Sequence, residues 1–167
     1  QKYYSKRLDE ELQRSRRFQQ PLCVVKLGLD DYSEIEKSLG EPARDLIFKN
    51  LATLIQKSSR SHDAACRTDE NEISLILPNC KKSEAEVRAE RLRRMVETNS
   101  LINNGLKMTI SLGACEYPSM CSTAQKLDEG ATRSLQFIMS KGGNKVCFFK
   151  APSGHKPDFN PAQGAKA

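Results

Sequence analysis

Apolar and polar positions change period along the chain, and these changes predict a succession of helices and strands. Residues 22–29 (LCVVKLGL) are almost entirely apolar and partly β-branched, as is typical of a central strand covered on both faces. In four other segments the apolar positions recur every three or four residues, which predicts amphipathic helices. These segments are residues 1–19, 42–58, 83–97 and 124–139.

A β-hairpin is predicted between the second and third helical segments. Residues 64–66 and 73–77 form two strand-like runs, and the polar, acidic residues 68–71 separate them. Two further strands are predicted at 106–114 and 145–149.

The order of these elements is helix, strand, one or two helices, hairpin, helix, strand, helix, strand. Such mixed connections predict an α+β fold with helices packed on a sheet. We expect one domain over residues 1–150, cut from a longer protein because the first helix begins without an N-cap signal. Residues 151–167 are rich in Pro, Gly and Ala, and we expect a disordered tail there.

The amino-acid composition argues against a membrane-spanning protein, a cysteine-bound metal and a nucleic-acid interface. The 167 residues are 38% hydrophobic and 29% charged, which indicates a globular protein, and no apolar run approaches the roughly 20 residues of a membrane helix. The six cysteines form no C-x-x-C pair, so we expect free thiols in the cytoplasm and no metal bound by them. Much of the net charge of +6 lies in arginine-rich helices, where solvated faces are expected rather than a DNA or RNA interface.

Arg60 and Asp63 form the one Arg-x-x-Asp tetrapeptide in the chain, directly before the predicted hairpin. A guanidinium can bridge O6 and N7 of guanine or clamp a phosphate, and a carboxylate can accept from guanine N1–H and N2–H. The pair therefore suits a guanine nucleotide. The structural alternative is a surface ion pair worth about 0.2–0.5 kcal/mol.

An ordered set of motifs resembles the GGDEF domain of diguanylate cyclases over roughly Tyr3 to Phe149. The resemblance implies a βααββαβ core with a mostly antiparallel sheet, and a bacterial enzyme that condenses two GTP into cyclic di-GMP with two magnesium ions. The motifs that carry it are RRFxxPL at 16–22, LDDY at 29–32, RTDENEI at 67–73, LP at 77–78, AERLR at 89–93, TISLG at 109–113 and GGN at 142–144.

The chain departs from the family pattern where the family performs its chemistry. A metal-binding Asp is matched by Gly28, and the second metal carboxylate by the neutral Asn71. Two signature glycines are matched by Asp69 and Glu70, whose charges would repel a triphosphate by about 4 kcal/mol per pair of charges at close range.

The groups that hold the nucleotide in the family also differ. Met139 and Gly143 stand at two basic positions, with Lys141 out of register, and Glu36 replaces an Asn that contacts guanine while Asp45 matches the family's Asp. We therefore expect no catalytic residues and no magnesium. We interpret Asp30 and Asp31 as a solvated strand end.

The family's inhibitory product site is retained. Arg60 and Asp63 lie at its spacing, five residues before the signature, and Arg91 matches its secondary arginine. The resemblance implies a non-catalytic receptor that binds cyclic di-GMP as an intercalated dimer of the ligand. Ligand binding would change how the receptor docks to a protein or peptide partner. We also expect a ligand-linked dimer of the protein.

Two alternatives stay open. One is a protein-interaction module that binds no nucleotide and docks partners on the altered signature turn. The other is residual cyclase activity. The altered signature turn comprises Asp69, Glu70, Asn71, Glu72 and Ile73.

Overall fold

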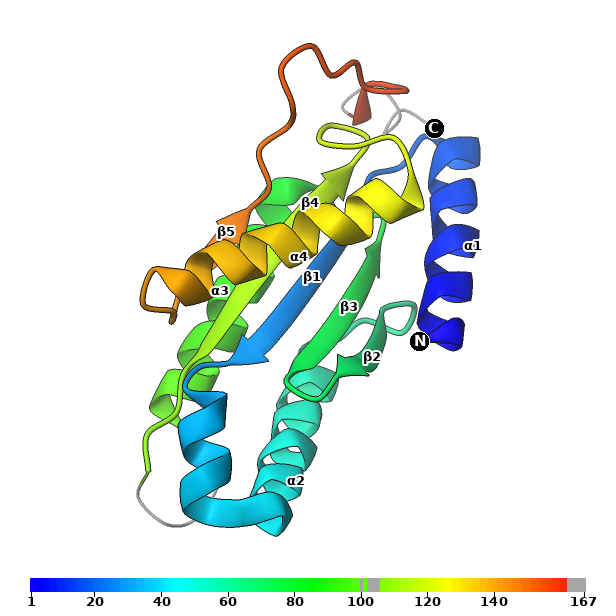
Figure 1. The fold of residues 1–167 in the computed structure, drawn as a ribbon. Coiled ribbons are helices and arrows are strands. Elements are labelled where there is room, and N and C mark those ends of the chain that lie inside the picture. The colour runs from blue at the N-terminus through cyan, green and yellow to red at the C-terminus, as the bar shows by residue number, and fades with distance from the viewer. Residues whose placement is uncertain (100, 102–105, 162–167) are drawn as a thin grey trace.

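The computed structural model describes residues 1–99, 101 and 106–161 and contains a five-stranded sheet in the order β2-β3-β1-β4-β5 (Figure 1). The elements are α1 (Lys2–Phe18), β1 (Leu22–Leu29), α2 (Tyr32–Ser58), β2 (Ala64–Asp69), β3 (Glu72–Pro78), α3 (Lys82–Thr98), β4 (Ile110–Tyr117), α4 (Ala124–Ser140) and β5 (Val146–Phe148).

β1 is the central strand of the sheet, as its sequence predicted. It pairs antiparallel with β3 on one side and with β4 on the other, so that Leu22 lies opposite both Pro78 and Tyr117. All eight residues of β1 are buried. β5 adds to β4 in parallel, and the other pairings are antiparallel. The predicted α+β fold with a mostly antiparallel sheet is confirmed.

Helices cover both faces of the sheet. Because side chains alternate along a strand, Val25 and Leu27 point into a first core cluster with α2 and α3, whereas Leu22 and Val24 point into a second with α1 and α4. Figure 1 shows α3 behind the sheet and α4 in front of it. This double cover explains why β1 is a continuous apolar run.

Two boundaries differ from the prediction. α2 begins at Tyr32 and continues across a kink at Gly40, whose φ of 80° favours glycine and which precedes Pro42. β4 begins at Ile110 rather than at residue 106. No helix of the described residues is long and apolar enough to cross a membrane.

The segment after β5 corrects the prediction of a disordered tail in part. Ala151 and Phe159 pack against the second core cluster, and the ring of Phe159 lies edge-on to that of Tyr117, 5.7 Å between centroids. Asp158 accepts a hydrogen bond from the Tyr117 hydroxyl at 2.7 Å and pairs with Arg16 of α1 at 3.5 Å. Residues 162–167 lie outside the described residues.

Candidate functional site

Arg60 and Asp63 lie in the loop that joins α2 to β2, and they are in contact. The Asp63 carboxylate accepts from the Arg60 backbone N–H at 2.8 Å and from the Arg60 guanidinium at 3.4 Å. The guanidinium also donates to the carbonyl of Pro78, at the end of β3, at 2.8 Å. The Asp63 side chain is only 3% exposed, whereas that of Arg60 is 37% exposed. Asp63 therefore orients Arg60, and Arg60 reaches solvent.

Arg88 of α3 is a third member of this site that the sequence reasoning missed. Its guanidinium donates to the second oxygen of Asp63 and to the carbonyl of Ser58. Two guanidiniums thus share one carboxylate, which leaves a net positive charge. Hydrogen bonding with Cys23 and, to a smaller extent, this charge lower the pKa of the Cys80 thiol.

The structure does not join Arg91 to this pair. Arg91 is exposed on α3, in a shallow depression beside Val87 and Arg94, and it makes no hydrogen bond or ion pair with another described residue. Arg88, one turn earlier on α3, occupies the position against Asp63 instead.

The predicted hairpin is confirmed, and its turn carries the altered signature. Asp69 and Glu70 are exposed at the tip, where Asp69 accepts from the Glu70 backbone N–H at 2.8 Å. Neither residue has a positive φ, so this backbone does not need the glycines that the family has there. Ile73 is buried in the first core cluster.

Asn71 fastens the turn to the end of β1. Its side-chain oxygen accepts from the Leu29 N–H and its side-chain nitrogen donates to the Leu29 carbonyl, both at 3.0 Å. Only an amide can donate and accept in this way, because a carboxylate has no proton to donate. Both polar atoms of Asn71 are therefore engaged with the backbone.

Glu72 belongs to a largely buried polar network. Its carboxylate pairs with Lys26 at 3.1 Å and accepts from the Thr68 hydroxyl at 2.6 Å. Lys26 also pairs with Asp128 of α4 at 2.9 Å, and Asp128 accepts from the hydroxyl of Tyr4 in α1 at 2.7 Å. Burial and hydrogen bonding to Asp128 raise the pKa of Tyr4. The network links the hairpin to α1 and α4.

Gly28 has Met139 beside it. A Cβ atom at Gly28 would lie 3.1 Å from the Met139 sulfur and 3.3 Å from the Asn71 carbonyl oxygen. The thioether thus occupies space next to the backbone position where the family has a metal-binding Asp. A longer side chain at Gly28 requires Met139 to move.

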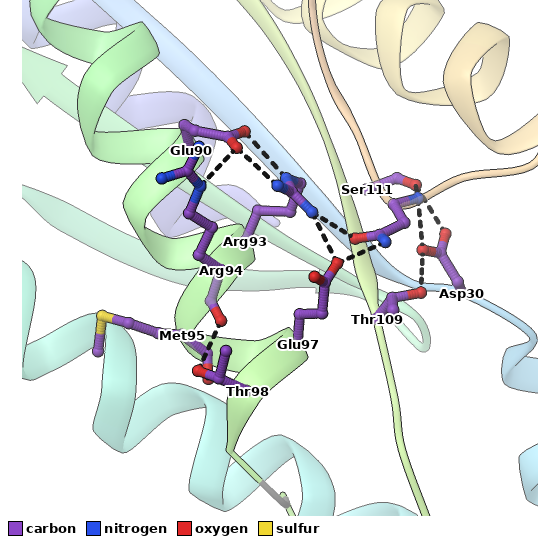
Figure 2. Close-up of polar contacts among 10 residues, drawn as sticks. Asp30, Glu90, Arg93, Arg94, Met95, Glu97, Thr98, Thr109 and Ser111 are labelled. Carbon is purple, nitrogen blue, oxygen red and sulfur yellow. Dashed lines mark hydrogen bonds and ion pairs between the residues drawn. The ribbon is translucent and has the colours of Figure 1, made fainter.

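Asp30 is buried and not solvated, which corrects the interpretation of a solvated strand end (Figure 2). Its carboxylate accepts from the hydroxyls of Thr109 and Ser111, each at 2.7 Å, and from the Asn144 N–H at 2.8 Å. A Cβ atom at Gly143 would lie 2.4 Å from this carboxylate. Asp31 is exposed with a φ of 56°.

The Asn144 side chain continues this network to α3. It accepts from Arg93 at 2.8 Å and donates to Glu97 at 2.6 Å, and Arg93 also pairs with Glu90 and Glu97 (Figure 2). The hydrogen bond from Arg93 lowers the pKa of Glu90, and the one from Asn144 lowers that of Glu97. Asn144 of the GGN motif is therefore engaged in structural contacts.

Glu36 and Asp45, at the positions that contact guanine in the family, both pair with Arg44. Arg44 pairs with Glu36 at 3.2 Å, with Glu41 at 3.2 Å and with Asp45 at 3.5 Å. Lys141, the cation nearest to the family's phosphate-binding position, is exposed and lies over the ring of Phe137, 5.8 Å from its centroid.

These residues do not fit a magnesium ion. Magnesium binds several oxygen ligands in an octahedral arrangement, but Gly28 has no side chain, Asn71 is bonded to Leu29, and Asp30 accepts three protein hydrogen bonds. Across residues 1–99, 101 and 106–161, no three His, Cys, Asp or Glu side chains are placed to hold a metal ion.

Known proteins resemble the chain over most of its length. Residues 1–145 match the family model described as diguanylate cyclase, GGDEF domain. Diguanylate cyclase A of Treponema denticola is 30% identical over 131 residues, which are 77% of this chain and 35% of that protein. This chain thus spans about a third of that relative's length.

Two solved structures share the fold. The GGDEF domain of DgcB from Caulobacter crescentus, solved in complex with c-di-GMP, has a TM-score of 0.80 at 20% identity, covering 88% of this chain and 86% of that one. Diguanylate cyclase SiaD from Pseudomonas aeruginosa, solved in complex with its activator SiaC, has a TM-score of 0.80 at 25% identity, covering 88% of this chain and 57% of that one.

Proposed function

This chain belongs to the GGDEF domain family, and we propose that it is a non-catalytic receptor that binds cyclic di-GMP through Arg60, Asp63 and Arg91 and relays it to a protein partner. The observation that carries the proposal is the assembled cluster of Arg60, Asp63 and Arg88, which has a net positive charge, while Asn71, at a position of the cyclase site, is taken up by internal contacts. DgcB, with the same fold, supports cyclic di-GMP as the ligand class.

Arg60 is suited to the guanine or phosphate of the ligand. Its guanidinium is held by Pro78 and Asp63, and its Nε atom has no hydrogen-bond partner among the described residues. The 3.4 Å contact to Asp63 is the longer of its two side-chain bonds, so a guanine N–H can replace Arg60 on that oxygen. Arg88 stays on the other oxygen and holds Asp63 in place.

Arg91 supplies a further cation for the phosphates. It is exposed and forms no ion pair with a described residue, so no internal contact has to break when it binds a ligand. The proposal includes no magnesium ion. It places the receptor in the bacterial cytoplasm, where free thiols such as the six cysteines persist.

Calorimetric titration of cyclic di-GMP tests the proposal. We expect wild type to bind two ligands per chain, as an intercalated dimer requires, and Arg60→Ala and Arg91→Ala to weaken binding about tenfold or more, which is 1.4 kcal/mol. Arg94→Ala is the matched control, because Arg94 lies on α3, is 72% exposed and forms its one ion pair within the described residues with Glu90. Absence of binding to wild type, or unchanged affinity in both Arg60→Ala and Asp63→Ala, would overturn the proposal.

Two further measurements test its other parts. Sedimentation with and without cyclic di-GMP should show a ligand-linked dimer. Incubation with GTP and magnesium should give no cyclic di-GMP, and product formed by wild type would show that the chain is a cyclase after all.

A nucleotide-independent interaction module is the second candidate. Asp69 and Glu70 are exposed at the hairpin tip and form no ion pair within the described chain, which leaves an acidic surface for a basic partner. Capture of the same partner with and without cyclic di-GMP, lost in Asp69→Lys, would favour this function.

A further inference from the structure

A groove of about 690 Å³ lies between α2 and β2, on the side of the sheet that carries the first core cluster. Phe48, Ala52 and Ile55 line it from α2, and Ala65 and Ile73 line it from the hairpin. Its volume lies within the range of ordinary binding pockets. The groove also includes Arg60 and Asp63 at one end, but most of its lining takes no part in the proposed dinucleotide site.

One wall of the groove is an edge strand of the sheet. Among the described strands, β2 is the last in the sheet and pairs only with β3 (Figure 1). One group of this edge is already engaged, because the Thr68 carbonyl accepts from the Gln1 side chain at 3.3 Å. Elsewhere along such an edge, N–H and C=O groups can pair with another extended segment. Ala65 and Arg67 are exposed and line the groove, as does part of Cys66. Ala64 and Cys66 also pack against the second core cluster.

The charges of the groove favour an acidic occupant. Lys49 forms no ion pair within the described chain, and Arg67 stacks on Phe48 at 4.3 Å with a carbonyl as its hydrogen-bond acceptor. The two acidic residues of the lining are already paired, Asp45 with Arg44 and Asp63 with two arginines. Lys49 and Arg67 therefore remain without counter-charges.

We propose that this groove docks an extended peptide segment of a partner protein, which adds to the edge of β2. Alternate side chains of a strand point to the same face, so the side chains that enter the groove follow the pattern acidic-x-apolar-x-acidic. The apolar side chain packs between Phe48, Ala52 and Ala65, and the acidic ones pair with Lys49 and Arg67. The docking site rests on the groove alone and does not require dinucleotide binding.

Fluorescence anisotropy with a labelled synthetic peptide tests this docking. In the probe, Glu, Leu and Glu alternate with Thr, so that its groove-facing side chains have the proposed pattern. We expect saturable binding to wild type. A peptide with Lys in place of Glu should bind at least about tenfold more weakly because its charge is reversed. A peptide with Pro in place of the inner Thr residues should fail to bind, because Pro has no N–H to pair with β2.

Matched substitutions locate the site. Lys49→Glu should weaken peptide binding about tenfold, whereas Lys57→Glu, at an exposed position of the same helix outside the groove, should leave it unchanged. Ala52→Tyr should abolish binding by filling the groove, and Thr53→Tyr, at the adjacent exposed position outside it, should not. Circular dichroism melts of each variant establish that it is folded.

Several results would overturn the docking site: no saturable binding to wild type, equal binding of the basic peptide, or equal effects of Lys49→Glu and Lys57→Glu. A dimer of the free chain that Ala52→Tyr dissociates would assign the groove to a second copy instead. If wild type binds the peptide but not cyclic di-GMP, only the proposed receptor function is refuted. If it binds cyclic di-GMP but not the peptide, only the docking site is refuted.

Discussion

Asn71 shows how one residue of the altered signature has become part of the framework. It bridges the N–H and the carbonyl of Leu29, and this requires a group that both donates and accepts. At the same position the family carries a carboxylate that binds metal. In this chain the amide forms a fixed link between the hairpin and the end of β1.

Asn71→Asp should therefore lower the free energy of unfolding by about 1–3 kcal/mol, because the Leu29 carbonyl loses its donor and faces a carboxylate. Urea denaturation measures the effect. Asn79→Asp is the control, since Asn79 is exposed in a left-handed conformation that Asp also tolerates. Equal stability of Asn71→Asp and wild type would show that the bridge contributes nothing.

Gly28 offers a second test at this scale. Gly28→Asp should lower the free energy of unfolding by about 1–3 kcal/mol, because the new side chain overpacks against Met139. Combining it with Met139→Ala should recover part of the loss, which a double-mutant cycle measures in thermal or urea unfolding. Purely additive effects would show that the two residues do not compete for the same space.

Among the elements, α3 connects the described parts of the site. Through Arg88 it holds the loop that contains Asp63, and through Arg93 and Glu97 it holds Asn144 before β5. The carboxylates of Glu90 and Glu97 have lowered pKa values in these contacts. Their stabilisation is present above the ordinary carboxylate pKa and is lost as pH falls through the lowered values.

Low pH should therefore weaken the contacts of Glu90 and Glu97 that hold the turn at Asn144. We expect wild type to lose thermal stability as pH falls from about 5 to about 3, and Glu97→Gln to lose less over the same range because one of the titrating groups is gone. Glu86→Gln, at an exposed α3 position without an ion pair among the described residues, is the control. Glu90 and Glu97 are partly exposed, so solvent screens their ion pairs. We therefore expect only a small difference in stability loss between wild type and Glu97→Gln.

The sequence predicted what depends on neighbouring residues and missed what depends on packing between elements. Arg60 and Asp63 could be paired because three residues of one loop separate them. Arg88 could not be assigned to Asp63, since that contact depends on how α3 packs against the loop. Nor could the sequence show that Met139 lies over Gly28, or that Asp30 is buried beneath the turn before β5. The order of strands and helices followed from periodicity and turn residues, whereas the starts of α2 and β4 did not.

At the scale of the whole molecule, the segment after β5 acts as a strap. It joins the second core cluster to α1 through Phe159, Asp158 and Arg16. Its composition predicted disorder because a segment rich in Pro, Gly and Ala has little to bury. The prediction failed there because Tyr117 supplies both a ring and a hydroxyl for it.

Removing residues 151–167 should lower the free energy of unfolding by about 1.5–3 kcal/mol, the value of burying one large apolar side chain. Removing only residues 162–167 is the matched control, which separates the contribution of the strap from that of the chain end. Burial and the hydrogen bond to Asp158 raise the pKa of Tyr117 to about 12, so its phenol should titrate late in wild type and earlier in Asp158→Asn. Loss of stability in the short truncation as well would assign the effect to the chain end instead.

The buried carboxylate of Asp30 limits which residues position 143 can accept. A Cβ atom at Gly143 would lie 2.4 Å from Asp30, and one at Gly28 would lie 3.1 Å from the Met139 sulfur. A larger residue at either position therefore needs its neighbour to move or to be replaced as well. Engineering the cyclase pattern into this chain would thus require paired substitutions, Gly143 together with Asp30 and Gly28 together with Met139.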